Sequence, residues 1–207
     1  MRLAEVAAKL PMFPNSIQKF QHQSGSYQKS AQFLKEYRIP GCIIASDGTI
    51  SKTGSVDLIY FPGDRLPVQF GSVSGDFDAH DIPLTSMIGF PTRVGGSLRL
   101  NQTPINSLDG IPRIIGRDLH LVDTDIHSLS GISKLVESIG GKVIIGSTQT
   151  HLLGLLVISG VKQIIINSLM NVSDPVAKIL NKYVGTGDTI SAQDELLDAG
   201  FTDRARL

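Results

Sequence analysis

The sequence predicts an α+β fold, a small solenoid in which short parallel strands stack in successive coils between helical caps at both ends. A phrase of about 21 residues recurs in register, as VSGDFDAHDIPLTSMIGFP from Val73, VGGSLRLNQTPINSLDGIP from Val94 and IGRDLHLVDTDIHSLSGIS from Ile115. Such a period is typical of stacked coils, because a single coil cannot bury its apolar side chains alone. Helix-forming segments flank the repeats. We divide the chain into a helical N-terminal segment (1–40), the solenoid (41–170) and a C-terminal helical cap (171–207).

The N-terminal segment is polar and is expected to be helical. Ser30 to Tyr37 (SAQFLKEY) has the spacing of a short amphipathic helix. Pro40 predicts its end, because the residue before a proline is pushed out of the helical region. Glutamine and serine crowd the stretch before this helix, so we expect a flexible joint near Gly25.

Each coil is expected to contribute one short strand, a turn and a second apolar contact. Ile43 to Val56 predicts an opening hairpin, with Asp47-Gly48 as its turn. Stepping by 21 residues superposes apolar side chains in columns: Val56, Phe77, Leu98 and Leu119; Leu58, Ala79, Leu100 and Leu121; Leu84, Ile105 and Ile126; Leu66, Met87, Leu108 and Leu129. A glycine column, Gly89, Gly110 and Gly131, marks a position where the backbone is expected to need a positive φ.

The next coil is longer, because the insertion at 134–138 moves the strand column to Val143 and Ile145, a spacing of 24. Three threonines form one further column: Thr103, Thr124 and Thr148. Their hydroxyls could hydrogen-bond the backbone of the neighbouring coil as a ladder, or they could be ordinary β-branched filler. The sequence favours neither alternative.

The end of the chain predicts a last strand and two helices. The apolar run Leu152 to Val161 predicts buried structure, and Lys162 to Ile166 predicts the last strand. Ser173-Asp174-Pro175 is a typical helix start, a capping side chain followed by proline at the first helical position. That helix is expected to end at Gly185, and a second to run from Ser191 to about Gly200. A polar helical pair is what a solenoid needs as a terminal cap.

Composition narrows the class of protein. The chain carries 19 Lys and Arg against 19 Asp and Glu and shows no basic stripe, which argues against nucleic acid as the main partner. Cys42 is the only cysteine, so no internal disulfide can form. The longest apolar stretch is about half of what a membrane span needs, and the first residues lack the apolar core of a signal peptide. We expect a soluble protein of a reducing compartment with no membrane partner.

Several strings of this chain match one known pattern. They are Val73-Ser-Gly-Asp-Phe77 with Leu84-Thr-Ser-Met-Ile-Gly89, and Val94-Gly-Gly-Ser-Leu98 with Ile105-Asn-Ser-Leu-Asp-Gly-Ile-Pro112. The repeats resemble leucine-rich repeats, and more narrowly the leucine-rich-repeat-like proteins of large tailed bacteriophages, over roughly residues 33–207. The asparagine of that family's repeat is replaced here by Ile82, Thr103 and Thr124. The resemblance implies a leucine-rich-repeat-like solenoid, a phage source and the host cytoplasm, but no single activity.

Strand alternation predicts a polar strip on one face of the solenoid. If Phe77 and Ala79 point inward, the residues between and beside them point outward. Neighbouring strands lie about 4.8 Å apart, so Asp57 and Asp78 would repel each other, and Arg99 is the expected compensator. We call the following residues the polar strip and expect them to form a concave binding surface: Asp57, Asp76, Asp78, His80, Arg99, Asn101 and His120. A solvent-facing sheet would also be polar without any such role.

Chemical motifs are absent from the sequence. Asp76, Asp78 and His80 have the spacing of a metal site, but they lack a fourth ligand and Arg99 would oppose a cation, so we predict no metal. His120 and His127 are expected to be exposed. No P-loop, zinc-protease or nucleophile-elbow motif occurs, and we predict neither a cofactor nor an enzymatic activity.

The leading hypothesis is therefore a phage-encoded protein-interaction module that binds a host or phage protein through its repeat surface. The alternative is a structural component of the virion or of a homo-oligomeric phage assembly. The apolar segment 152–166 motivates the alternative, because a last coil so rich in leucine and isoleucine could dock on another subunit.

Overall fold

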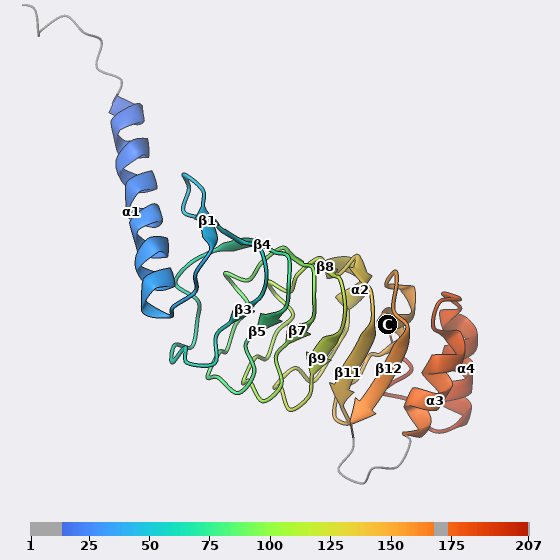
Figure 1. Cartoon of the computed structure of the whole chain (residues 1–207). Coiled ribbons are helices and arrows are strands. Elements are labelled where there is room, and N and C mark those ends of the chain that lie inside the picture. The colour runs from blue at the N-terminus through green and yellow to red at the C-terminus, as the bar shows by residue number, and fades with distance from the viewer. Residues whose placement is uncertain (1–13, 168–173, 207) are drawn as a thin grey trace, which may run out of the picture.

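Two mainly parallel sheets of six strands run along a solenoid of stacked turns (Figure 1). The structure is a computed structural model that describes residues 14–167 and 174–206, with the backbone alone for 14–24. Helix α1 (Pro14–Glu36) projects from one end, and helices α3 (Pro175–Tyr183) and α4 (Thr189–Asp198) lie at the other. The predicted α+β solenoid is thus confirmed as an architecture. The predicted cap boundary at 170/171 lies outside the described residues.

Each turn contributes a strand to both sheets, whereas the sequence predicted one strand per coil. The front sheet contains β3 (Val56–Asp57), β5 (Phe77–Asp78), β7 (Leu98–Arg99), β9 (Leu119–Leu121), β11 (Lys142–Gly146) and β12 (Gln163–Asn167). The rear sheet contains β1 (Cys42–Ile44), β2 (Ile50–Lys52), β4 (Phe70–Val73), β6 (Arg93–Val94), β8 (Ile114–Ile115) and β10 (Ser138–Ile139). All named pairs are parallel except the predicted β1–β2 hairpin, which is antiparallel.

The register of the front sheet confirms the predicted apolar columns. Phe77 pairs with Leu98 and Leu98 with Leu119, and the column continues to Val143 across the predicted spacing of 24. The residues inserted before β11 include the short helix α2 (Ile132–Leu135). These side chains are fully buried, so each turn supplies apolar area to both neighbours. Burying one leucine contributes about 1.5–3 kcal/mol, which makes stacking the main source of stability.

Helix α1 is longer than predicted and passes through Gly25 without a joint. A single glycine costs a helix only about 1 kcal/mol, and no proline interrupts the stretch. The helix ends before the predicted Pro40, and Phe33 anchors its last turns. Its ring packs edge-on against those of Phe61 and Phe70, at centroid distances of 5.8 and 6.2 Å. The described part of the chain contains no helix that is both long and apolar enough to cross a bilayer.

The threonine column is only partly as predicted. Thr103 and Thr124 are buried, but each hydroxyl donates to the carbonyl three residues earlier in its own turn, at 2.7 and 3.1 Å, and not to a neighbouring coil. Thr148 is exposed. Gln149 occupies the buried position instead and donates to the carbonyl of Leu121. The longer turn before β11 shifts the buried position by one residue.

Glycines allow the turns to approach closely. Gly89 and Gly110 of the predicted column have φ angles of 95° and 88°. Residues other than glycine rarely adopt this backbone conformation. A second column, Gly95, Gly116 and Gly140, was not predicted. A Cβ atom on any of these three would overlap with the carbonyl group of the preceding turn. Their role is to let one backbone lie directly on another.

The last turn is covered by its own chain. A 3₁₀ helix, Leu153–Val157, carries buried leucines and contacts α2, α3 and α4. Asp174 caps α3 by accepting from the amides of Val176 and Ala177, as the sequence predicted. The apolar segment that motivated a docking surface for another subunit is therefore mostly interior. Helix α4 begins two residues before the predicted Ser191, because Asp188 is its cap.

Candidate functional site

The polar strip lies on the outer face of the front sheet. Asp57 pairs with Asp78, Asp78 with Arg99, and Arg99 with His120, so these four form one row across four strands. The alternation prediction is confirmed, because Phe77 and Ala79 are fully buried while Asp76, Asp78 and His80 remain partly exposed. The row continues on β11 and β12 as Ile144 and Ile165. The strip therefore changes from charged to apolar toward the C-terminal end.

Arg99 joins the acidic residues of the preceding turn, as expected of a compensating charge. Its Nη1 lies 2.9 Å from Asp76 Oδ2 and 3.5 Å from Asp78 Oδ2. The amide of Ser97 and then the guanidinium of Arg99 hold the pKa of Asp76 below its usual value. Because Arg99 touches two carboxylates, its position over the sheet is fixed from two sides. These three side chains are partly exposed, so their attraction is weakened by solvent.

The two strip histidines are in opposite electrostatic settings. His80 Nδ1 lies 2.6 Å from Asp78 Oδ1, and this hydrogen bond raises the pKa of His80. Burial, followed by the nearby charge of Arg99, lowers the pKa of His120. His120 is half-buried, which corrects the expectation that it would be exposed, because the Arg99 and Ile144 strands flank it. His127 is exposed as predicted.

A ladder of hydrogen bonds, which the sequence did not predict, runs along the front sheet and includes one residue of the polar strip, Asp76. Its rungs are Ser55, Asp76, Ser97 and Asp118, and each side-chain oxygen accepts from the amide of the next residue of the row, the last being Lys142. The distances are 3.0, 2.8, 3.4 and 2.7 Å. The ladder ends at Lys142, whose side chain has no acceptor.

Two further strip residues also bind the backbone. Asn101 Oδ1 accepts from the amide of Val122 on the next turn, at 2.9 Å. Asp57 Oδ1 accepts from the amide of Ile59 in its own turn, also at 2.9 Å. Most of the strip thus has a structural role, and the same bonds hold its outward-facing atoms in fixed positions.

The strip offers no cluster for a metal. Among residues 14–167 and 174–206, no group of three or more His, Cys, Asp or Glu side chains could hold an ion. Asp76 is committed to the Ser97 amide and to Arg99, and Asp78 to Arg99 and His80. The candidate trio of Asp76, Asp78 and His80 therefore lacks free ligand atoms that converge.

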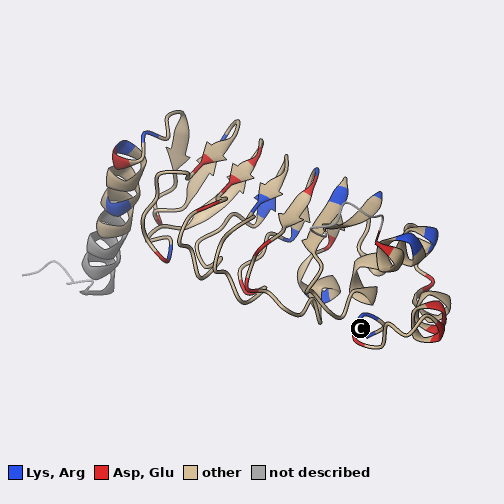
Figure 2. Ribbon diagram, turned by 90° about the horizontal axis from the view of Figure 1, so that it is seen from below, with Lys and Arg blue, Asp and Glu red and all other residues tan. Residues whose placement is uncertain are grey.

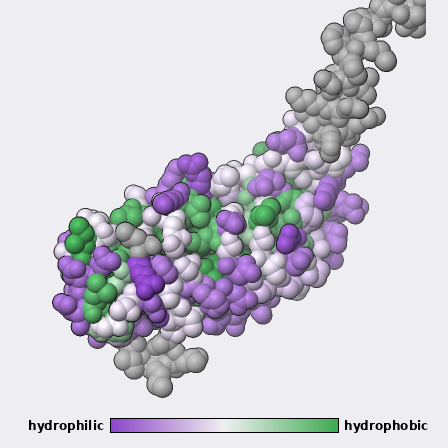
Figure 3. All heavy atoms as spheres, turned by 180° about the vertical axis from the view of Figure 1, so that it is seen from behind, coloured by the Kyte–Doolittle hydropathy of each residue, from purple (hydrophilic) through white to green (hydrophobic). Residues whose placement is uncertain are grey.

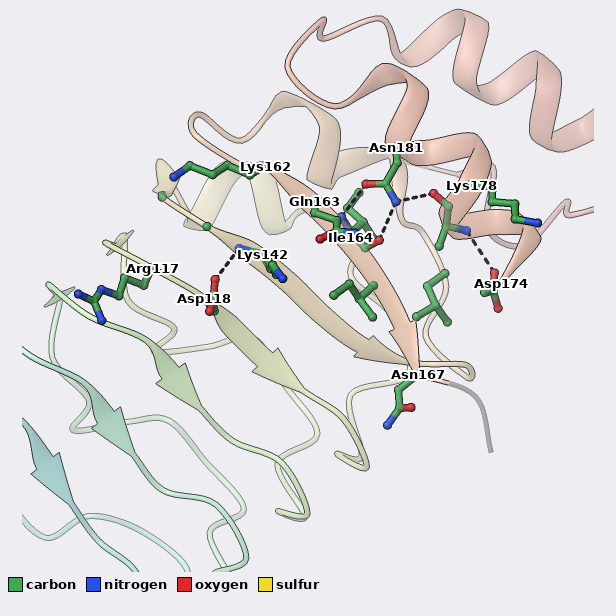
Figure 4. Close-up of a pocket in the computed structure, with 15 residues that line it drawn as sticks. Arg117, Asp118, Lys142, Lys162, Gln163, Ile164, Asn167, Asp174, Lys178 and Asn181 are labelled. Carbon is green, nitrogen blue, oxygen red and sulfur yellow. Dashed lines mark hydrogen bonds between the residues drawn. The ribbon is translucent and has the colours of Figure 1, made fainter. Parts of the chain in front are cut away.

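A groove of about 1080 Å³ lies at the C-terminal end of the front sheet, and the sequence did not predict it (Figure 4). The residues just before β9, the start of β11 and strand β12 form one side, and helix α3 forms the other. Asn181 of α3 connects the two: Oδ1 accepts from the amide of Ile164 at 2.8 Å and Nδ2 donates to its carbonyl at 2.7 Å. Asn181 thus provides the backbone groups of Ile164 with the hydrogen-bond partners that a further strand would provide. The signal in the sequence is a basic residue beside each strand start, at Arg117, Lys142 and Lys162.

Cationic residues outnumber acidic ones in the lining of this groove. None of Arg117, Lys142, Lys162 and Lys178 forms an ion pair with another part of the described chain. The two acidic lining residues, Asp118 and Asp174, each accept from backbone amides. Figure 2 shows acidic residues on the strands at the α1 end of the front sheet and basic ones at the starts of its last strands.

The comparisons with known proteins identify no relative. No family model, no curated protein and no solved structure matches this chain.

Proposed function

We propose that the protein is a non-enzymatic binding module that recognises a protein partner through the outer face of its front sheet. The observation that carries this proposal is the fixed arrangement of charged side chains on two neighbouring turns, in which Arg99 contacts Asp76 and Asp78 and Asp78 also bonds to His80. Groups that are already held in place lose little conformational freedom on binding. Mixed-sign charge on an open face favours specific recognition of a complementary protein surface.

The partner follows from the resemblance in the sequence. The recurring strings from Val73 and Val94 resemble those of the leucine-rich-repeat-like proteins of tailed bacteriophages. We propose on that basis that the coils are leucine-rich-repeat-like and that the partner is a host or phage protein met in the cytoplasm of the infected cell. The fold alone implies no activity, because function resides in the site.

A structural role in a virion or homo-oligomer remains the competing outcome of the experiment below. The leucines that first suggested it are buried under α3 and α4. On the face turned away in Figure 1, apolar residues form small groups separated by polar ones (Figure 3). Large self-assembling interfaces usually need a contiguous apolar patch.

The test is affinity capture of the tagged full chain from infected cells, in parallel with the triple variant Asp78→Ala, Arg99→Ala, His120→Ala. A matched control, Ser51→Ala, Ser72→Ala, Arg93→Ala, changes a row of the rear sheet. Circular dichroism first establishes that both variants are folded. Loss of a host or phage protein only with the front-sheet variant supports the proposal. Equal recovery with all three proteins, or recovery of virion proteins or of the chain itself in stoichiometric amounts, would overturn it.

A further inference from the structure

The cations of the groove outnumber its two carboxylates, Asp118 and Asp174, and are less closely paired than Arg99 of the polar strip. Arg99 is paired with two carboxylates, whereas Arg117, Lys142 and Lys162 pair with none in the described chain. They stand at or just before the first residues of three consecutive strands. Lys142 pairs in register with Gln163, so Lys162 lies one residue away on the adjacent strand. Neighbouring strands lie about 4.8 Å apart, so the positive charges on adjacent strands repel one another, and an anion bound between them would relieve this repulsion.

The groove also has an apolar side, which a simple inorganic anion would not use. Ile164, Ile165 and Ile166 line it. Ile165 is on the outward side of β12 and is half-buried, in the row that carries His120 two strands away. Figure 4 shows Ile164 beside Asn181 of helix α3, with Lys142 and Lys162 at the starts of the neighbouring strands. An occupant that fits both features carries carboxylates and an apolar side chain on one short stretch.

An extended peptide fits this pattern better than a nucleic acid does. Single-stranded nucleic acids are usually held by aromatic side chains that stack on the bases, and none of the described residues that line the groove is aromatic. The net charge of zero also provides no long-range attraction to a polyanion. A peptide in extended conformation presents alternate side chains on opposite faces, so an acidic residue on either side of an apolar one reaches the same surface.

We propose that this groove binds an acidic linear segment of a protein, with its carboxylates facing Arg117, Lys142 and Lys162 and an apolar side chain resting on Ile165. The inference rests on the proposed function only in that the occupant is a protein. It assigns a second contact region, beyond the polar strip, and gives the chemistry of what is bound there. The switch along the row from charged residues to Ile144 and Ile165 divides the front sheet into these two regions.

The test measures fluorescence anisotropy of a short labelled peptide that alternates glutamate with leucine, titrated with the full chain. The groove variant is Lys142→Glu with Lys162→Glu. The matched control, Lys29→Glu with Lys35→Glu, makes the same change in net charge at exposed positions of α1. We expect the groove variant to bind at least about tenfold more weakly, since two attractions become repulsions, and the control to bind as the unchanged chain does. Ile165→Asp should weaken binding through the apolar contact while leaving both lysines in place.

Three results would overturn the inference: no binding of the acidic peptide, equal weakening by the groove and control variants, or equally tight binding of labelled single-stranded DNA. The first two leave the proposed function intact, because partner capture depends on Asp78, Arg99 and His120. Conversely, the capture experiment could fail while the acidic peptide still binds. The groove would then be a binding site on a protein whose polar strip has no partner.

Discussion

Replacing Gly116 with alanine should destabilise the solenoid measurably. A Cβ atom at this position would overlap with the carbonyl oxygen of Gly95, well inside the 3.0 Å that real Cβ atoms keep from such atoms. The obstacle is backbone, which cannot rotate away as a side chain could. The φ angle of Gly116 lies outside the positive region, so the penalty comes from this contact alone.

The magnitude follows from the bonds that hold these turns together. Relieving the overlap requires the turns to separate by about 1 Å, while the Gly116 amide donates to Val94 at 2.8 Å and the Arg117 amide to Gly96 at 3.0 Å. Both bonds would then exceed the length of a normal hydrogen bond. Losing two such bonds costs about 2 kcal/mol, and residual strain adds about 1 kcal/mol. Alanine restricts the unfolded chain and offsets about 0.5 kcal/mol, so we expect a net loss of about 2–3 kcal/mol.

Urea unfolding followed by circular dichroism measures this loss as a lower midpoint at an unchanged slope. The control is Gly25→Ala, where the added methyl group meets no atom within 4 Å. Because Gly25 lies within α1, alanine there should be neutral or stabilising by up to about 1 kcal/mol. If the free energy of unfolding of Gly116→Ala lies within about 0.5 kcal/mol of that of the unchanged chain, the turns have room for a methyl group and the expected overlap does not occur.

Two further changes test the strip and the cap. In an NMR titration, His80 should titrate above 6.5 and return toward it in Asp78→Asn, because the Asp78 carboxylate favours the charged ring. Since the folded pKa is raised, the stabilisation from this pair is present below the unfolded pKa and is lost as the pH rises through the folded one. Asn181→Ala should cost about 2 kcal/mol and speed amide exchange at Ile164, whose amide and carbonyl lose their partner. Unchanged exchange there would contradict the role assigned to Asn181.

The stacking of the turns was predictable because it depends on side chains that must be apolar at every repeat. A charged residue in the column of Phe77, Leu98 and Leu119 would disrupt the core, so every repeat keeps an apolar residue there. The register of the strands therefore follows from the period of the sequence alone. Of the rear strands, the sequence predicted only the β1–β2 hairpin, because later pairs such as Arg93–Val94 are only two residues long and show no alternation of their own. The stacking glycines were visible as a recurring Gly95, Gly116 and Gly140, but a glycine column can equally mark a turn, and only the packed turns show which it is.

The site was predictable only where one strand determines it. Alternation along β5 places Asp76 and Asp78 outward, and the period places Arg99 beside them, so the ion pairs follow. The ladder was not predicted because a serine or an aspartate at an outward position is also expected on any solvent-exposed sheet. The groove was missed because it depends on where α3 lies relative to β12. The only polar side chain that connects α3 to the edge of β12 in the described chain is that of Asn181, in a helix whose buried face is otherwise apolar.

The point where the ladder ends separates the structural part of the front sheet from the part available to a ligand. From Ser55 to Asp118 each outward oxygen of the ladder accepts from the next turn, so replacing one disturbs both packing and surface charge. At Lys142 the acceptor is replaced by a cation, and the following strands carry positive charge that no described side chain neutralises. These unpaired cations repel one another, and an acidic ligand bound between them would relieve that repulsion. Reversing the charge of Lys142 should therefore weaken peptide binding without unfolding the protein. Replacing Asp118 should instead destabilise the fold without weakening peptide binding.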